Sequence, residues 1–263
     1  MARGARNIPE AYITCRHLYS SDTRTTHREM TPPALLLSLS EPGPDVPEAE
    51  FHDWYNSDHI PARIASPVFQ SWTRYTAIDG LKPSYMNIYD LESLEATKTP
   101  AYTNLPQNRS EAEKDLIKRV SWLEPRVYEE HHDDPFVAPS SLFNPIKPAE
   151  YALILTAELP PELEGEFMAW YTEELLPKVS KAPGWVRSRQ FKLKDWKRLG
   201  VEGSKDKTIP PTYLAIHEFA TAEFTELKET VQSDKTPRYE KLVQGRTSFQ
   251  RRVVKFLKKF ERV

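Results

Sequence analysis

The sequence predicts an α+β protein built from two copies of one unit, each running strand, helix, strand, strand, helix, strand. Three observations lead to this prediction. Bulky side chains recur at a fixed spacing, the same order of apolar and alternating segments surrounds each recurrence, and a proline-rich stretch separates the two halves. Because a duplicated fold keeps its order of elements longer than its residue identities, the order carries the most weight.

The repeat is clearest where residues 50–69 are compared with residues 165–185. A shift of 116 positions, from 51 to 167, places identical bulky or rigid side chains on one another. The matched pairs are Phe51 with Phe167, Trp54 with Trp170, Tyr55 with Tyr171, Pro61 with Pro177, and Pro67 with Pro183. Both segments are therefore expected to form the first helix of their unit.

The remaining elements follow in the same order in both halves, as period-2 alternation or short apolar runs that are typical of strands. In the first half, strands are expected at 33–40, 71–78, 83–93 and 119–130, and KTPAY at 98–102 opens the second helix. In the second half, strands are expected at 151–158, 187–194, 211–221 and 251–263, and KTPRY at 235–239 opens the second helix.

This order is that of a ferredoxin-like βαββαβ unit, whose antiparallel sheet has helices on one face only. The bare faces of the two sheets are expected to cover each other, which makes an intramolecular barrel-like pseudo-dimer. The predicted divisions are an N-terminal extension at 1–32, units at 33–130 and 150–263, a linker at 131–149 and a surface insertion at 198–211.

Composition narrows the class of protein. The 263-residue chain is 39% hydrophobic and 11% aromatic, which predicts a globular protein of one large or two small domains. Its formal net charge of −2 gives no general attraction to nucleic acid or to an anionic membrane, although the end from Asp234 onward is basic. The single cysteine, Cys15, excludes an internal disulfide, and neither a membrane span nor a signal peptide is recognisable. We therefore expect a cytoplasmic protein.

The first helix carries an acid among apolar residues. On a regular helical wheel the stripe expected to be buried consists of Phe51, Trp54, Tyr55 and Asp58. His59 lies on the flank of this stripe, and Pro61 is expected to break the helix.

The repeat separates two kinds of polar residue on this helix. Asp58 has an acidic counterpart, Glu174, so it is expected to have a structural partner such as a helix cap or an arginine. His59 has Leu175 as its counterpart, so one half alone keeps a titratable group there. This favours a general acid or base in the first half. An ordinary histidine with satisfied ring nitrogens is the alternative.

A second polar set lies on the predicted strands. The residues that alternate onto one face of the first unit are Tyr85, Asn87 and Tyr89, with Ser38 from the first strand. His217 falls on the corresponding face in the second unit. If the opposite side, which carries Met86, meets the helices, this polar and aromatic face lines the interior between the sheets. Such a cavity suits a flat, largely apolar, oxygenated ligand, and for His217 simple packing is the alternative.

The pattern resembles the dimeric α+β barrel superfamily and, within it, the EthD-like branch, where a D-W-Y-x-x-[DE]-H-x-P helix is typical. The motif residues here are Asp53, Trp54, Tyr55, Asp58, His59 and Pro61. The resemblance covers roughly residues 33–263 and implies relatives among cofactor-free cyclases, dehydratases, decarboxylases and small monooxygenases. In a related plant polyketide cyclase a histidine follows a Pro-Ala pair. Tyr102 stands at that place here, and a tyrosine there can polarise a carbonyl more readily than it can act as a base.

Other kinds of site have weaker support. Residues 129–135, EEHHDDP, include metal-ligand types without a spaced second set, so no metal is predicted. His217 is a candidate haem ligand without an accompanying haem signature. The sequence contains neither a glycine-rich phosphate loop nor a G-x-S-x-G nucleophile motif.

We therefore predict a cofactor-independent acid/base enzyme, a lyase or isomerase that acts as a dehydratase or cyclase on a hydrophobic oxygenated small molecule such as a polyketide-derived intermediate. His59 is expected to move the proton, with Tyr55 and Asp58 orienting it. Substrate contacts are expected from Tyr85, Asn87, Tyr89, Tyr102, His217 and Ser38. A cofactor-free monooxygenase and a non-catalytic binding protein are the alternatives. The chain is expected to be a monomeric pseudo-dimer or a homodimer without a nucleic-acid partner.

Overall fold

The structure is a computed structural model that describes residues 33–131, 137–225 and 236–262. The chain divides into two units, Met1–Thr31 and Pro32–Val263, and the first lies outside the described residues. The expectations for Cys15, for the extension at 1–32 and for residues 132–135 of the histidine- and aspartate-rich segment also fall outside them.

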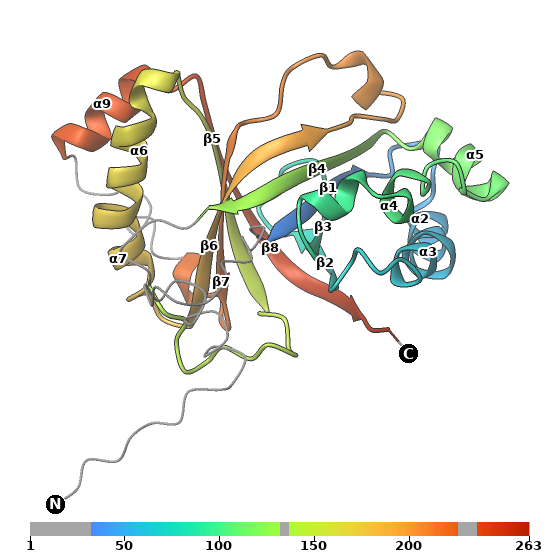
Figure 1. The fold of residues 1–263 in the computed structure, drawn as a ribbon, viewed down its shortest axis with the longest axis horizontal. Helices are drawn as coiled ribbons and strands as arrows, with labels where there is room; N and C mark the ends of the chain where they lie inside the picture. Colours follow the sequence, from blue (N-terminus) through green and yellow to red (C-terminus); the bar gives the residue numbers. More distant parts are fainter. Residues whose placement is uncertain (1–32, 132–136, 226–235, 263) are drawn as a thin grey trace, which may run out of the picture. The chain divides into compact units, whose positions relative to one another are not determined.

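Eight antiparallel strands close into a barrel in the order β1-β3-β2-β8-β5-β7-β6-β4 (Figure 1). The strands are β1 (Ala34–Glu41), β2 (Trp72–Ala77), β3 (Tyr85–Leu91), β4 (Trp122–His131), β5 (Tyr151–Glu158), β6 (Trp185–Trp196), β7 (Tyr213–Phe219) and β8 (Ser248–Phe260). The α+β class and the antiparallel barrel, both expected from the sequence, are confirmed.

Helical segments lie between these strands and share the same order in both halves. The longer segments are α2 (Glu48–Trp54), η1 (Tyr55–His59), α3 (Ile60–Ile64), α4 (Pro100–Thr103), α5 (Glu111–Arg119), α6 (Glu164–Trp170), η4 (Tyr171–Leu175), α7 (Leu176–Val179) and α9 (Pro237–Gly245). Short 3-10 turns are η2 (Glu95–Lys98), η3 (Pro161–Leu163), η5 (Gly203–Lys205) and η6 (Glu223–Thr225). Within the described ranges, no helix is long and apolar enough to cross a membrane.

Each half supplies four neighbouring strands, and the halves join at two seams. Strand β2 pairs with β8 and β4 pairs with β6, both antiparallel. Closure at these seams leaves the eight strands without an open edge, which removes a template for edge-to-edge association.

The barrel interior is aliphatic, and the aromatic face of the strands points outward to the helices. Leu35, Met86 and Ile88 of the first half form one buried cluster with residues of the second half such as Ile154. Only the interior of a closed barrel brings the strands of both halves into one such cluster. The expectation that the Tyr85 side lines the interior is therefore wrong. An eight-stranded barrel is just wide enough for its own side chains, so compact aliphatic residues occupy it and larger rings lie beneath the helices.

Two further cores lie between the outer strand faces and the helices. In Figure 1, α2 to α5 gather on one side of the strands and α6, α7 and α9 on the other. Phe51 and Trp54 of α2 share a core with Tyr89, and Phe167 and Trp170 of α6 share one with residues of β5 and β7. Each half thus covers its own strands.

The helices differ from the sequence expectation in two places. The first helix continues through Pro61 to Ile64, because the proline falls in the first turn of α3, where a missing N–H costs little. KTPAY opens only the four-residue α4, and the long second helix α5 begins after Ser110. The N-cap that corresponds to Ser110 in the second half is Thr236, which precedes α9.

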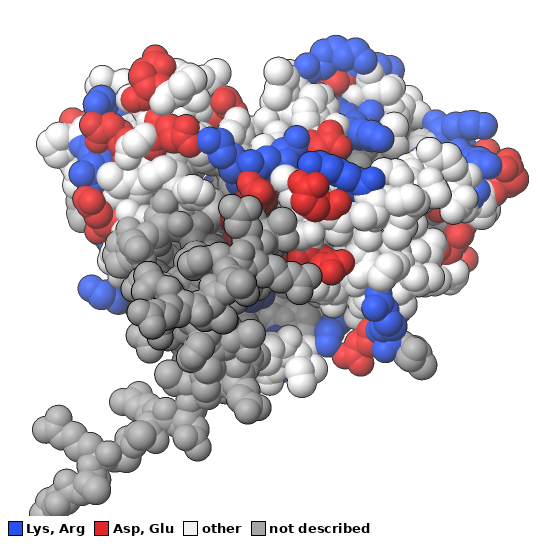
Figure 2. Space-filling view, viewed as in Figure 1, with Lys and Arg blue, Asp and Glu red and all other residues white. Residues whose placement is uncertain are grey.

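Charges are mixed on the surface. On the face seen in Figure 2, Lys and Arg lie among Asp and Glu, so that face carries no field of a single sign. The basic end of the chain includes α9 and β8. Arg238 of α9 pairs with Glu173, and in β8 Lys255 approaches Glu150 and Lys259 pairs with Glu261. The side chains of these pairs are partly or largely exposed to solvent.

Candidate functional site

A π-helical turn interrupts the first helix at the same place in each half, as η1 and as η4. A π turn holds more residues than an α turn, so side chains after it are rotated relative to a regular helix. His59 therefore takes the buried face, at 5% exposure, and Asp58 is only partly buried. The wheel that placed Asp58 on the apolar stripe is wrong because it assumed a regular helix.

Asp58 binds the start of the second helix. Asp58 accepts a hydrogen bond from the Ser110 hydroxyl. The Ser110 Oγ in turn accepts a hydrogen bond from the backbone N–H of Glu113 in the first turn of α5. In the second half, Glu174 accepts from Thr236 Oγ1 at 2.7 Å, at the start of α9. The two acids thus have the structural partner that their retention in both halves predicts.

His59 forms a buried pair with a residue that the sequence did not single out. Its Nδ1 lies 2.9 Å from Glu113 Oε1, and the two side chains are 6% and 2% exposed. Arg63 and Arg109 approach the same oxygen at 3.7 and 3.5 Å. Burial and the charge of Arg63 lower the pKa of His59 to about 3, and the bond to Glu113 only opposes this. Burial would raise the pKa of Glu113, but the His59 bond and the arginines hold it below its usual value. A neutral imidazole therefore rests on an ionised carboxylate at neutral pH.

Arg74 fills the space between the first helix and strands β2 and β3. Its guanidinium lies 4.0 Å from the centre of the Tyr55 ring, and the residue is 1% exposed. Three side chains bind its nitrogens: Asn87 Oδ1 at 3.3 Å, Asn56 Oδ1 at 2.9 Å and His52 Nδ1 at 3.1 Å. The guanidinium thus lies over an aromatic ring and is hydrogen-bonded by three side chains.

The predicted tyrosines gather around this arginine. Tyr55 and Tyr89 share a hydrogen bond between their hydroxyls, and Tyr85 donates to the Glu48 carboxylate. Burial raises the pKa of both Tyr55 and Tyr89, so these phenols keep their protons at neutral pH.

The other first-half candidates lie nearby. Asn87 is fully buried, and its amide nitrogen lies 3.4 Å from the Ser38 carbonyl oxygen. Tyr102 stacks on Phe69, with ring centroids 6.0 Å apart, and burial raises its pKa to about 12. Phe69 in turn packs edge-on against Tyr89. The structure therefore brings every predicted site residue except His217 into one half.

Strand register relates the two halves residue by residue. Arg74 pairs with Asn87 across β2 and β3, and Gln190 pairs with Ala215 across β6 and β7. Both second-half residues are smaller than their counterparts. The space that Arg74 fills in the first half is therefore vacated in the second.

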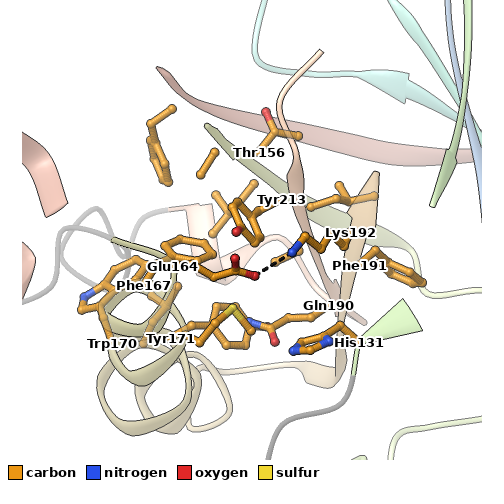
Figure 3. A pocket seen from close by; sticks show the side chains of 17 residues that line it. His131, Thr156, Glu164, Phe167, Trp170, Tyr171, Gln190, Phe191, Lys192 and Tyr213 are labelled. Carbon is orange, nitrogen blue, oxygen red and sulfur yellow. Dashed lines mark hydrogen bonds and ion pairs between the residues drawn. The ribbon is translucent and has the colours of Figure 1, made fainter. Parts of the chain in front are cut away.

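The vacated space belongs to a hollow beneath α6 and its π turn (Figure 3). The enclosed part of the hollow has a cavity volume of about 20 Å³, and the empty space reaches about 480 Å³ when the solvent at its mouth is counted. The enclosed part holds about one water molecule, so a larger ligand has to displace side chains such as the flexible Met168. The walls are mainly apolar and include Leu155, Phe167, Met168, Trp170, Tyr171, Tyr213 and Ala215. A second hollow, between α6 and α9, shares Phe167 and Trp170 with the first.

A polar edge borders the hollow. Lys192 Nζ lies 2.7 Å from Glu164 Oε1, and both side chains are about 40% exposed (Figure 3). The Lys192 bond lowers the pKa of Glu164. Burial and a hydrogen bond to Glu164 raise the pKa of Tyr213, which stays a phenol. Lys192 and Tyr213 are therefore donors beside a carboxylate, and the amide of Gln190 also lines the hollow.

His217 lies two residues beyond Ala215 on the same face of β7 and is completely buried. Its Nδ1 is 2.7 Å from Ser188 Oγ, and its ring stacks on Tyr171, with centroids 5.9 Å apart. No described residue binds its Nε2. Burial lowers the pKa of His217 to about 3, which keeps the imidazole neutral.

No described residues form a group of three or more histidine, cysteine or acidic side chains that could hold a metal ion. His217 has its Nδ1 on Ser188 and one ring face on Tyr171. Among the described residues, these contacts place it in a packed wall beside the hollow.

Sequence reasoning missed Arg74 and Glu113. The signal for Arg74 is its position: it shares the helix-facing side of β2 with Trp72, where an apolar residue is expected. Glu113 stands three residues after Ser110, the spacing of a capping box, and its side chain binds His59 instead of the cap.

No protein-family model matches the chain. Over 210 residues it is 25% identical to core atranone cluster (CAC) protein 1 of Stachybotrys chlorohalonatus, a match that covers 71% of this chain and 82% of that protein.

Solved structures share the fold. An anthrone oxidase-like protein is similar at a TM-score of 0.58 and 11% identity, over 89% of this chain and 96% of that one. A monooxygenase-like protein of Fusobacterium nucleatum is similar at a TM-score of 0.51 and 9% identity, over 87% and 94% of the two chains. At these identities the likeness shows the fold alone, which is the dimeric α+β barrel expected from the sequence.

Proposed function

We propose that the chain is an enzyme that transforms a hydrophobic, oxygenated small molecule by acid/base chemistry, as a dehydratase or cyclase without a resident cofactor. The observation that carries this proposal is the aromatic-walled hollow of the second half with Glu164, Lys192 and Tyr213 at its edge. We also propose that the two halves are tandem ferredoxin-like units of the EthD-like branch, with 131–149 as their linker.

The proposed chemistry begins with enolisation. The Glu164 carboxylate removes a proton from a carbon that is next to a substrate carbonyl or conjugated with it through an aromatic ring, and the electron pair of that C–H bond moves onto the carbonyl oxygen. Lys192 and Tyr213 donate to the resulting enolate oxygen, which is the kind of stabilisation that lowers such barriers most. In a dehydration the electrons return, the bond to a hydroxyl on the next carbon breaks, and the proton held by Glu164 leaves with it as water.

The first-half residues are the competing proposal for the proton carrier. In it His59 moves the proton, Tyr55 and Asp58 orient it, and the remaining predicted residues hold the substrate. The neutral imidazole of His59, with Nδ1 bound to Glu113, supports this role. Its burial beneath a helix whose inner space Arg74 fills favours the second-half site instead.

Oxygenation is a second candidate function. One relative is a core protein of the atranone cluster, and one structural neighbour is an anthrone oxidase-like protein. A cofactor-free oxygenase starts from the same carbanion, which then reacts with molecular oxygen. The two candidates therefore share the proton abstraction and differ in the next step.

Anthrone serves as a probe for both candidates, because its methylene group is acidic. Under nitrogen in D2O, the protein is expected to accelerate deuterium exchange at this carbon, measured by mass spectrometry. Glu164→Gln is expected to reduce that acceleration by about 100-fold or more, since it removes the base. Formation of anthraquinone in air but not under nitrogen would select the oxygenase.

Two controls locate the chemistry. Glu166→Gln changes a partly exposed acid on the same helix that pairs with Lys241, and it is expected to leave exchange unchanged. His59→Gln is also expected to leave it unchanged. Loss of exchange in His59→Gln but not in Glu164→Gln would move the chemistry to the first half, and no acceleration by the unaltered protein would reject an acid/base function for this site.

A further inference from the structure

The residues around Arg74 correspond to the walls of the second-half hollow. Its guanidinium lies near the rings of Phe51, Tyr55 and Tyr85, at 5.8, 4.0 and 6.0 Å from their centroids. The repeat and the strand register match these rings with Phe167, Tyr171 and Tyr213, and all three line the hollow. Arg74 thus occupies in one half the place that is empty in the other.

The groups that bind the guanidinium are changed in the second half. Its three partners, His52, Asn56 and Asn87, have Met168, Thr172 and Ala215 as counterparts. Two of the three counterparts lack a hydrogen-bonding side-chain group, and Met168 and Ala215 line the hollow. Gln190 replaces the arginine itself. The second-half copy has therefore lost both the occupant and most of the polar set that holds it.

We infer that Arg74 is a built-in occupant that closes the first-half copy of a duplicated ligand site, so that each chain binds a single planar aromatic ligand, in the second half. The ligand lies over the Tyr171 ring as the Arg74 guanidinium lies over the Tyr55 ring, 4.0 Å from its centre. This inference deepens the proposed function, on which it rests only in treating the hollow as a ligand site.

The chemistry of the walls defines the ligand class. A flat π-system matches the Tyr171 ring and the apolar side chains of Met168 and Ala215. A charged or strongly polar ligand group buried against them would have no hydrogen-bonding partner. An oxygen at one edge of the ligand reaches the donors Lys192 and Tyr213. The ligand is thus a fused aromatic molecule with a peripheral hydroxyl or carbonyl, of which 1-naphthol is a simple example.

Exchange of the two residue sets tests the inference. The opened variant, Arg74→Gln with His52→Met and Asn87→Ala, gives the first half the residues of the second. The closed variant, Gln190→Arg with Met168→His and Ala215→Asn, does the reverse. Each variant moves the occupant together with two of its three partners and leaves Asn56 or Thr172 in place. The opened variant has no guanidinium at this place, and the guanidinium of the closed variant has hydrogen-bonding partners. Isothermal titration with 1-naphthol is expected to give one site for the unaltered protein, two for the opened variant and none for the closed variant.

Each alternative outcome overturns a stated part. One site in a folded opened variant, judged by its cooperative thermal transition, shows that Arg74 does not close a site. Undiminished binding by the closed variant, or no binding by the unaltered protein, rejects the second-half hollow as the aromatic site. If one variant does not fold, the other decides, since each gives its own prediction. Binding is measured without turnover, so the expected stoichiometries alongside a failed anthrone exchange would reject the enzymatic proposal alone.

Discussion

Buried imidazoles make the stability of this protein depend on pH. In the described part of the chain His59 and His217 are both buried, and burial is the main cause that lowers the pKa of each to about 3. In the unfolded chain both have a pKa near 6.5. Between this value and about 3, the two imidazoles bind protons in the unfolded state and do not bind them in the folded state. The free energy of unfolding therefore falls as pH drops from about 6.5 toward 3, and it is unaffected by these groups above 6.5.

Replacement of one of these rings isolates its contribution. His217→Phe keeps a flat ring against Tyr171 and removes the titration. Between pH 6 and pH 4 the variant is expected to lose about 1.4 kcal/mol less per pH unit than the unaltered protein. Urea unfolding at pH 8, 6, 5 and 4 measures this difference. Parallel curves across the whole range would mean that His217 is protonated in the folded protein.

The site could be predicted in part at this scale. The repeat singled out His59 because its counterpart is Leu175. The structure shows that His59 is buried, which agrees with both a functional and an ordinary packed histidine. Its partner Glu113 is 54 residues away, and no sequence spacing links the two. Arg74 was not predicted as a site residue, because an arginine in a strand is normally solvated and only the folded structure shows which face of the strand it occupies.

At the scale of elements, sequence periodicity predicted where the strands lie but not which face of each strand meets the helices. Strand β5 (Tyr151–Glu158) has the bounds expected from the sequence, because the side-chain pattern of a strand is a local property. Alternation shows which residues share a face and does not show which face meets the helices, so the Tyr85 side was assigned to the wrong layer. The π turns could not be predicted from a helical wheel either. A wheel assumes a constant angle per residue, and these turns change that angle in both halves.

The insertion at 198–211 depends on one glycine. Gly200 has a φ of +97°, and a Cβ placed there would lie 2.7 Å from the carbonyl oxygens of Val120 and Ser121. Leu199 next to it pairs with Leu123 of β4 through backbone hydrogen bonds of 2.8 and 3.0 Å. The close approach of the two backbones therefore requires a residue without a side chain.

Gly200→Ala is expected to lower the free energy of unfolding by about 3 kcal/mol, from backbone strain together with the clash. Gly80→Ala is the matched control. Gly80 has a φ of +74° with nothing within 4 Å of an added Cβ, so it reports the strain alone, about 1 kcal/mol. Urea unfolding of both variants gives the comparison. Equal losses would show that the insertion moves aside without cost.

At the scale of the whole described barrel, charges inside it join the two halves. Arg189 of β6 donates to Asp90 of β3 at 2.6 Å and lies 3.3 Å from Glu218 of β7. Burial alone would raise the pKa of Asp90, but Arg189 and Arg187 hold it at about 2. The carboxyl therefore stays ionised through the physiological range. One arginine thus ties an acid of the first half to an acid of the second.

Arg189→Met tests how much this tie contributes to closure of the barrel. The substitution removes the cation that Asp90 and Glu218 share, and these acids are 34% and 8% exposed. Loss of one partner of a buried pair costs about 3 to 5 kcal/mol, and the partial exposure of Asp90, with Arg187 still acting on it, reduces the expected loss to about 2 to 3 kcal/mol. Lys194→Met on the same strand is the control. Lys194 also crosses a seam between the halves, to Glu129 at 2.6 Å, but both side chains are partly exposed, so about 1 kcal/mol or less is expected.

The pH dependence separates a lost ion pair from lost packing. In Arg189→Met the carboxyl of Asp90 has a higher folded pKa than the value of about 2 in the unaltered protein, so the variant binds this proton at a higher pH and loses less stability as pH falls. The difference in free energy of unfolding between the variant and the unaltered protein, measured by urea unfolding, should therefore become smaller as pH falls from 7 to 4. A difference that stays constant over this range would assign the loss to the packing of the arginine side chain. The two halves would then be held together by the β2–β8 and β4–β6 strand pairs and the aliphatic interior, without help from this charge.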